Sequence, residues 1–421
     1  MPSSKAFITS GRLSFRMAIP SESSKSSLSS VMFFPPLRRE IGVRLTMSRK
    51  SKTTYIASEE LREKIMTGIR TRPTHGASVW TGEQLQQEHS WEYPLDEADR
   101  SALAAALEGV EGMQLERITK ENFPLPGLSG RLRMLSHDLA DGRGFALVRG
   151  FPVDGYCYKE IERMYWGFCS HLGDGLTQNG DATFIHYVTD GKLRPSQGRR
   201  GVGFPRESKL HIDLTDVVSL LCVQQAPDDP PSRVASSTAI FNEVLKRDKS
   251  VLPRLYEGFE WDRMDEHAPH ETPTSGYKVP LFSEKDGFIS CQYNRNWINN
   301  AAERSGNSLT SEENAIFDLL DEIAFELCLE FPFGKGDVQF CNNYTVLHGR
   351  AGHEVVKEET LKRVLMRIWL DFPGDIRPFV DHSLIRYGNG RHGQVGWTAA
   401  EMLVGKNTVP RPRRDDGALK I

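Results

Sequence analysis

The chain has 421 residues, of which 38% are hydrophobic, enough to bury a sizeable core in one large domain or two. Its formal charge of −3, from 53 basic and 56 acidic residues, excludes a global basic field for binding nucleic acid or an anionic membrane. There is no apolar run of about 18 residues, so a membrane span is not expected. Six cysteines lie scattered without C-x-x-C spacing, which predicts reduced core residues rather than a zinc site or a disulfide framework.

The amino-terminal segment differs in composition from the rest of the chain. Residues 1–50 hold nine Lys or Arg and two Glu, a net charge of +7 that leaves −10 for the remainder. Such a Ser- and Arg-rich segment is typical of a disordered tail or of a mitochondrial transit peptide. Because it contains no clear basic amphipathic helix, we expect it to be unfolded and the protein to be cytoplasmic, with a mitochondrial location as the alternative.

The next segment, residues 51–79, is expected to be a linker with a short helix around Glu59–Ile69, and the folded body to begin near Trp80. Within the body, helical spacing occurs in residues 98–107, 158–172 and 312–329, and short apolar runs typical of buried strands occur in residues 144–151 and 217–223. Mixed strands with flanking helices predict an α+β fold in which helices brace a jelly roll.

The tripeptide His211-Ile212-Asp213, with His348 much later in the chain, predicts a metal site. Side chains two residues apart on a strand leave the same face, and a distant segment can bring the second histidine alongside. Two histidines and one carboxylate can hold one face of an octahedral iron(II), which leaves three positions for a cosubstrate and dioxygen. An H-x-D tripeptide alone is weak, however, because such residues more often cap, pair or face solvent.

Support comes from residues 362–370, which alternate with period two and predict a strand. One face is apolar, and Arg363 and Arg367 share the other. If that face lines a barrel interior, two buried guanidinium groups need anionic partners, and a dicarboxylate bound through paired N–H···O bonds would serve. The alternative is an edge strand with two solvated arginines.

These motifs, taken in order, resemble the taurine/2,4-D dioxygenase (TauD/TfdA-like) group of iron(II)- and 2-oxoglutarate-dependent oxygenases, which is also similar to clavaminate synthase. The matching pieces are residues 210–213, 235–240, 336–350 and Arg363-x-x-x-Arg367. The resemblance covers roughly residues 80–385 and implies a double-stranded β-helix, the distorted jelly roll of that group. One departure is the Pro- and Asp-rich stretch of residues 226–233, where many relatives carry a short Gly-rich turn.

The resemblance also implies roles for particular residues. His211, Asp213 and His348 would be the catalytic metal ligands for iron(II). Arg363 would grip the distal carboxylate of 2-oxoglutarate, assisted by Thr238, which stands about 25 residues after the ligand aspartate. Arg367 would face the primary substrate and bind its acid group.

The expected activity is oxidation of a C–H bond, by hydroxylation or desaturation, in a small acidic metabolite, with 2-oxoglutarate and dioxygen as cosubstrates. The partner would be this small molecule, with no nucleic acid or membrane involved. The alternatives are a peptide or protein hydroxylase with the same metal triad and a non-catalytic cupin-like binding protein. The dioxygenase domain would span residues 80–390, followed by an extension over residues 391–421.

Other polar residues carry weaker hypotheses. His186 and His353 are expected in loops or on the surface, and Arg295 is either a substrate contact or an exposed side chain. Asn342-Asn343 is expected to order the backbone near the metal ligands. The segment Gly198–Gly203 lacks the G-K-[ST] of a phosphate loop, which favours a flexible lid over the site.

Overall fold

The computed structural model describes residues 68–179, 181–189, 205–267, 272–374, 376–379 and 395–404. The chain divides into two units, residues 1–52 and residues 53–421, and every described residue belongs to the second. The expected lid at residues 198–203 lies outside the described residues, as does the expected helix at residues 59–69 apart from its end. In the described part of the chain, no helix is long and apolar enough to cross a membrane.

The larger of the two main sheets has seven strands in the order β1-β2-β11-β6-β13-β3, with β4 also paired to β13. Its strands are β1 (Glu92–Pro94), β2 (Phe145–Arg149), β3 (Asp174–Leu176), β4 (His186–Val188), β6 (Val217–Gln224), β11 (Val338–Asn342) and β13 (Val364–Asp371). All neighbours are antiparallel except β1 and β2. Strand β13 is therefore interior, with β6 on one side and β3 and β4 on the other.

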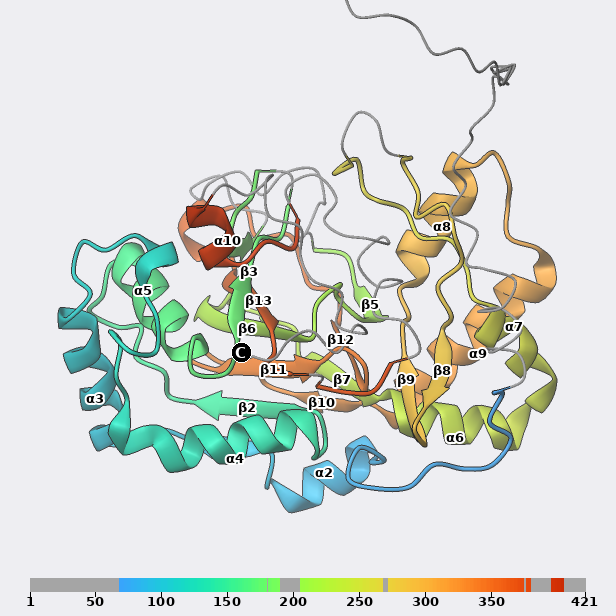
Figure 1. Cartoon of the computed structure of the whole chain (residues 1–421), viewed down its shortest axis with the longest axis horizontal. Helices are drawn as coiled ribbons and strands as arrows, with labels where there is room; N and C mark the ends of the chain where they lie inside the picture. The colour runs from blue at the N-terminus through green and yellow to red at the C-terminus, as the bar shows by residue number, and fades with distance from the viewer. Residues whose placement is uncertain are drawn as a thin grey trace, which may run out of the picture. The chain divides into compact units, whose positions relative to one another are not determined.

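The second main sheet has four strands in the order β10-β7-β12-β5, and β8 and β9 form a separate hairpin. These strands are β5 (Ser208–His211), β7 (Ser232–Ser236), β10 (Leu329–Phe331), β12 (Val346–Arg350), β8 (Phe282–Lys285) and β9 (Phe288–Cys291). Strands β4 to β7 alternate between the two sheets along the chain, and so do strands β10 to β13. This two-sheet arrangement confirms the expected jelly-roll core (Figure 1).

Helices surround the two sheets (Figure 1). They are α2 (Gly82–Glu88), α3 (Glu97–Glu108), α4 (Ser129–Ala140), α5 (Tyr158–Cys169), α6 (Ser237–Arg247), α7 (Leu252–Glu257), α8 (Arg295–Arg304), α9 (Ser311–Leu327) and α10 (Ala399–Leu403). Short 3-10 turns cover Leu115–Arg117, Pro126–Leu128, Lys249–Val251 and Glu359–Leu361. Helix α4 packs on β2, and α6 packs on α9 beside β7.

The elements expected from periodicity are present with small shifts at their ends. Strand β2 fills residues 145–149 of the apolar run, β6 fills residues 217–224, and α3 and α9 match their expected ranges within two residues. Helix α5 ends at Cys169, three residues before the expected Leu172. The end of β13 also agrees within one residue, although the strand begins at Val364, just after Arg363.

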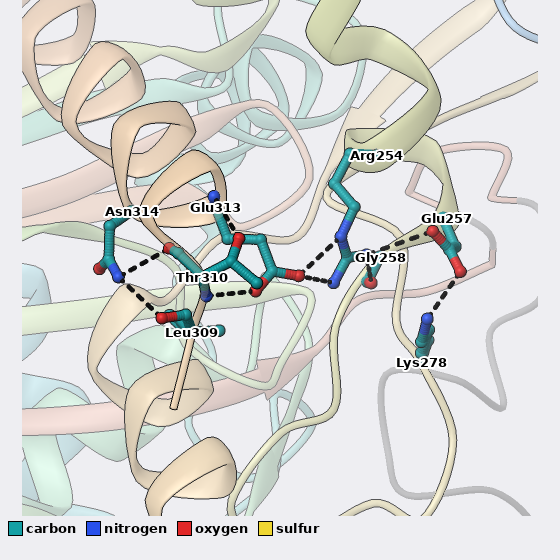
Figure 2. Close-up of polar contacts among 8 residues, drawn as sticks. All are labelled: Arg254, Glu257, Gly258, Lys278, Leu309, Thr310, Glu313 and Asn314. Carbon is teal, nitrogen blue, oxygen red and sulfur yellow. Dashed lines mark hydrogen bonds and ion pairs between the residues drawn. The ribbon is translucent and has the colours of Figure 1, made fainter. Parts of the chain in front are cut away.

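An ion-paired network joins the end of α7 to the start of α9 (Figure 2). Thr310 caps α9 by accepting a hydrogen bond from the Glu313 backbone, and the Glu313 carboxylate accepts from the Thr310 backbone at 2.9 Å. The same carboxylate pairs with Arg254 of α7 at 2.7 Å. Arg254 also donates to the Gly258 carbonyl at the end of α7. One carboxylate thus caps a helix and ties it to its neighbour.

Residues before Trp80 already contact the folded body of the protein. Arg70 pairs with Glu284 of β8 at 3.0 Å, and Thr74 exchanges two backbone-to-side-chain hydrogen bonds with Asn242 of α6, at 2.8 and 2.9 Å. These contacts favour a domain boundary before Arg70 rather than near Trp80.

Candidate functional site

The two histidines come together because β5 and β12 are neighbours in the smaller sheet. His211 and His348 are direct cross-strand partners, and their ring centroids lie 4.6 Å apart. Gly349 permits this close approach of the strands, because a Cβ there would lie 2.5 Å from the Ser208 carbonyl oxygen. Pairing of two strands remote in sequence therefore puts both imidazoles on one face.

Asp213 completes the cluster just after the end of β5. One ligand atom from each of His211, Asp213 and His348 lies within 4.8 Å of the others. The Asp213 backbone N–H donates to the side-chain oxygen of Asn343 at 2.9 Å. Asn343 therefore orders the backbone at this aspartate, as expected for the Asn342-Asn343 pair.

The Asp213 carboxylate is buried and receives two hydrogen bonds on the same oxygen. Arg367 Nη1 and Trp369 Nε1 each donate to Oδ2 at 3.0 Å. Burial alone would raise the pKa of Asp213, but Arg367 together with the two histidines outweighs it and holds that pKa well below its usual range. The carboxylate is therefore ionised at neutral pH and can act as an anionic metal ligand.

Both imidazoles present nitrogen lone pairs to the cluster. His211 Nδ1 lies 2.7 Å from the Lys209 carbonyl oxygen, which places the proton on Nδ1 and leaves Nε2 free to bind a metal. Burial, reinforced by His211, lowers the pKa of His348 to about 3, so this ring is neutral at neutral pH. Two imidazoles and one carboxylate fit a divalent transition-metal ion such as iron(II).

A cavity of about 600 Å³ opens beside these three residues. This size suits a small molecule. Its basic lining residues are Arg206, Lys209, Arg295, Arg350, Arg363 and Arg367, against the acidic Glu207 and Asp213. Of these, Arg295 pairs with Asp318 and Asp321, and Lys209 also pairs with Asp321, so the charges of both are largely committed outside the cavity wall. The excess of positive charge favours an anionic ligand.

Arg363 and Arg367 are two of these basic lining residues, and each is only 6% exposed. Arg363 Nε lies 3.0 Å from the Asp229 carboxylate, and Arg367 donates through Nε to Gln178 at 2.8 Å as well as to Asp213. Because β13 is an interior strand and both guanidinium groups are buried, the alternative of an edge strand with solvated arginines is wrong.

Thr238 is the expected site residue that the structure does not bring to the cavity. It lies in the first turn of α6, fully buried, and donates to the Ser78 carbonyl at 2.6 Å. Ser232, at the start of β7, lines the cavity instead, together with Arg363. The strand ends at Ser236, so Thr238 has left the alternation of the sheet and its hydroxyl faces Ser78.

Two polar residues of the interior were missed or misjudged from the sequence. Gln339 of β11 lines the cavity, is 2% exposed, and has a side-chain oxygen without a hydrogen-bond partner in the described part of the chain. A polar residue between the apolar Val338 and Phe340 was the signal available for it. The expectation of a loop or surface position for His186 was wrong: it lies fully buried in β4, paired in register with Arg367.

The sequence matches a known protein family and is similar to individual known proteins. The profile of the family described as "Taurine catabolism dioxygenase TauD, TfdA family" matches residues 110–369. FR-33289 synthase of Streptomyces rubellomurinus is 27% identical over 316 residues, covering 73% of this chain and 92% of that protein. Taurine hydroxylase-like protein SAT17 of Stachybotrys chartarum is 30% identical over 308 residues, covering 69% of this chain and 77% of that protein.

A solved structure supports the fold. Asparagine oxygenase in complex with Fe(II), 2S,3S-3-hydroxyasparagine and succinate superposes with a TM-score of 0.52 at 14% sequence identity. The match covers 66% of this chain and 93% of the oxygenase. At this level of identity the likeness concerns the fold alone.

Proposed function

The chain belongs to the taurine catabolism dioxygenase TauD, TfdA family, which makes it an iron(II)- and 2-oxoglutarate-dependent dioxygenase, and we propose that it oxidises a C–H bond of a small acidic metabolite. The observation that carries this proposal is a cluster of two histidines and an aspartate beside a cavity with two buried arginines. When bound, the iron couples decarboxylation of 2-oxoglutarate, to succinate and carbon dioxide, with oxidation of the substrate by dioxygen.

In this proposal His211, Asp213 and His348 are the protein ligands of the iron. Their support is the donor chemistry of imidazole nitrogens and an ionised carboxylate. The Lys209 carbonyl orients His211, and Asn343 orders the backbone of Asp213. Arg367 and Trp369 hold Asp213 Oδ2, which lies 3.8 Å from His348 Nε2, so the carboxylate is fixed beside the imidazole.

Arg363 is proposed to bind the distal carboxylate of 2-oxoglutarate. Its guanidinium is buried, lines the cavity and has no recorded hydrogen bond from Nη1 or Nη2 to any described residue, so both can engage a carboxylate. Ser232, which also lines the cavity, takes the role first expected for Thr238, because its hydroxyl can donate to the same carboxylate.

Arg367 is proposed to lie closer to the primary substrate and to favour an acidic one. Its contact with Asp213 puts it next to the metal ligands, where the reacting C–H bond must be held. The excess of basic residues around the cavity supports an anionic substrate, and Gln339 adds a polar group on the same wall. A cavity of this size favours a small metabolite over the peptide or protein of the alternative hydroxylase.

Anaerobic titration with iron(II) and 2-oxoglutarate tests the proposal. The wild-type protein should develop a weak visible metal-to-ligand charge-transfer band, and addition of oxygen should release succinate. His348→Ala should lose iron binding, the band and turnover, because it removes one of three protein ligands. His353→Ala, a change outside the cluster, is the matched control and should behave as wild type.

The outcomes separate the hypotheses. A wild-type protein that binds an acidic ligand without the band and without turnover would be the non-catalytic binding protein. Normal iron affinity and activity in His348→Ala would refute the ligand assignment while leaving the family unaffected.

A further inference from the structure

We infer that Asp229 is a positioning residue that holds Arg363 in place to receive the distal carboxylate of 2-oxoglutarate. The inference rests on the proposed function of Arg363, and it gives a role to an acidic residue that has none in that proposal. Asp229 lies in residues 226–233, the Pro- and Asp-rich stretch in which this sequence departs from the family pattern.

The pair of Arg363 and Asp229 is buried, and only Arg363 lines the cavity. Arg363 Nε and Asp229 Oδ1 lie 3.0 Å apart, and the two side chains are 7% and 6% exposed. Arg363 lines the cavity, whereas Asp229 does not. The Nε–H is not aimed at Oδ1, and neither Asp229 carboxylate oxygen has a hydrogen-bond partner in the described part of the chain. The contact is therefore an ion pair at Nε, made by an acid outside the cavity lining, and it leaves the two Nη atoms available.

The loop that carries Asp229 is stiff. Pro227, Pro230 and Pro231 each fix a backbone angle, and a residue that precedes proline, as Asp229 does, is restricted to extended conformations. Ser232 follows directly as the first residue of β7, held by pairing with β10 and β12. One short stretch thus fixes both the acid behind Arg363 and the hydroxyl beside it in the cavity.

The charges around Arg363 explain why an acid is useful there. An arginine stays charged even when buried, and an unpaired buried charge is costly. Before cosubstrate binds, Asp229 provides the compensating charge. When the cosubstrate carboxylate arrives, the guanidinium is already oriented, so less side-chain freedom is lost on binding.

A carboxylate this close could act in the opposite way, by competing with the cosubstrate for Arg363. The two roles predict opposite signs. If Asp229 positions Arg363, its removal weakens 2-oxoglutarate binding; if it competes, its removal strengthens binding. We commit to the first, because Asp229 approaches Nε and not the two Nη atoms that would receive the cosubstrate, and because Asp229 does not line the cavity.

The test compares Asp229→Ala and Asp229→Asn with Asp228→Ala, a change of the neighbouring exposed acid as matched control. Calorimetric titration of 2-oxoglutarate into manganese(II)-loaded protein gives the dissociation constant without turnover. The uncoupled rate of 2-oxoglutarate decarboxylation by the iron(II) enzyme gives the KM and kcat.

For Asp229→Ala we expect the dissociation constant and KM to rise about tenfold, comparable to the loss of other orienting partners, with kcat at saturating 2-oxoglutarate unchanged. Asp229→Asn removes the charge but keeps the side-chain volume, and because the contact is an ion pair without a hydrogen bond it should weaken binding by a similar factor. Asp228→Ala should match wild type.

Unchanged or tighter binding in Asp229→Ala would overturn the inference, and if that variant does not fold, unchanged or tighter binding in Asp229→Asn would do so. A wild-type protein that fails to bind 2-oxoglutarate would instead refute the proposed function itself, so the two failures are distinguishable.

Discussion

Each of the two buried arginines of the cavity meets a carboxylate, but the carboxylates differ in kind. Arg367 pairs with Asp213, a proposed metal ligand, whereas Arg363 pairs with Asp229, which lies away from the cavity wall. Because of this difference, removal of either arginine should disturb a different part of the site. Their shared strand face therefore does not make them interchangeable.

The first prediction ranks the two arginines. Arg363→Leu should weaken 2-oxoglutarate binding by about 2–5 kcal/mol, because it removes a charged partner from a buried carboxylate. Arg367→Leu should weaken cosubstrate binding much less, but should lower iron affinity, because Asp213 loses the cation that favours its ionised form. Anaerobic titration of 2-oxoglutarate at saturating iron(II) measures the difference, and the reverse ranking would contradict the assigned roles.

The second prediction separates Ser232 from Thr238. Ser232→Ala should raise the KM for 2-oxoglutarate by about ten- to a hundredfold with little change in melting temperature, because a hydrogen-bond donor leaves the cavity. A net hydrogen bond to a charged group contributes about 1.5–3 kcal/mol. Thr238→Val should leave this KM unchanged and lower the melting temperature, because the buried Ser78 carbonyl loses a donor. Equal KM effects of the two changes would show that Thr238 reaches the cosubstrate after all.

At the scale of elements, the site depends on strands fixed by helices outside it. Helix α9 packs on β5 and β7 of the smaller sheet and on α6, and its first turn is tied to α7 through Glu313 and Arg254 (Figure 2). This network lies outside the cavity lining, so it should affect stability without affecting chemistry.

The third prediction tests that separation. Glu313→Ala removes both the capping interaction and the partner of Arg254, and should lower the free energy of unfolding by about 1–2 kcal/mol. Glu312→Ala, one residue earlier and exposed in the same turn, is the control and should change it by less than about 0.5 kcal/mol. Chemical denaturation measures both, and a changed 2-oxoglutarate affinity in Glu313→Ala would argue against the separation.

At the scale of the whole molecule, the amino-terminal boundary matters because the residues just before Trp80 contact the catalytic body. Ser78 accepts hydrogen bonds from Ser236 and Thr238, where β7 passes into α6. Arg70 and Thr74 bind β8 and α6. The segment from Arg70 to Ser78 therefore stabilises the strand that begins with Ser232.

The fourth prediction concerns shortened chains. A chain that starts at Met47 should bind iron and decarboxylate 2-oxoglutarate at the full-length rate, because every proposed site residue lies beyond position 200 and residues 1–52 form a separate unit. A chain that starts at Trp80 should have a lower melting temperature, because it lacks the contacts of Arg70, Thr74 and Ser78. Loss of metal by the Met47 chain would mean that the first 46 residues belong to the fold.

The sequence by itself determined the features that depend on short-range periodicity. The H-x-D spacing predicts two side chains on one side of an extended segment, although β5 itself ends at His211. The alternation through residues 363–370 predicts two arginines on one face, although β13 begins just after Arg363. Both patterns repeat over a few residues, so they are legible without the fold. The order of these motifs along the chain was then enough to indicate the family.

Only the tertiary structure decided which distant residues meet these motifs. The contact between Asp229 and Arg363, the burial of His186 beside Arg367, and the replacement of Thr238 by Ser232 in the cavity all depend on strand pairing between separate segments. Thr238 does not line the cavity as expected, because β7 ends at Ser236 and α6 begins at Ser237. At this point the period of side-chain direction passes from two residues to about 3.6. Local spacing cannot carry such information, because the energy that fixes these contacts comes from packing across the two sheets.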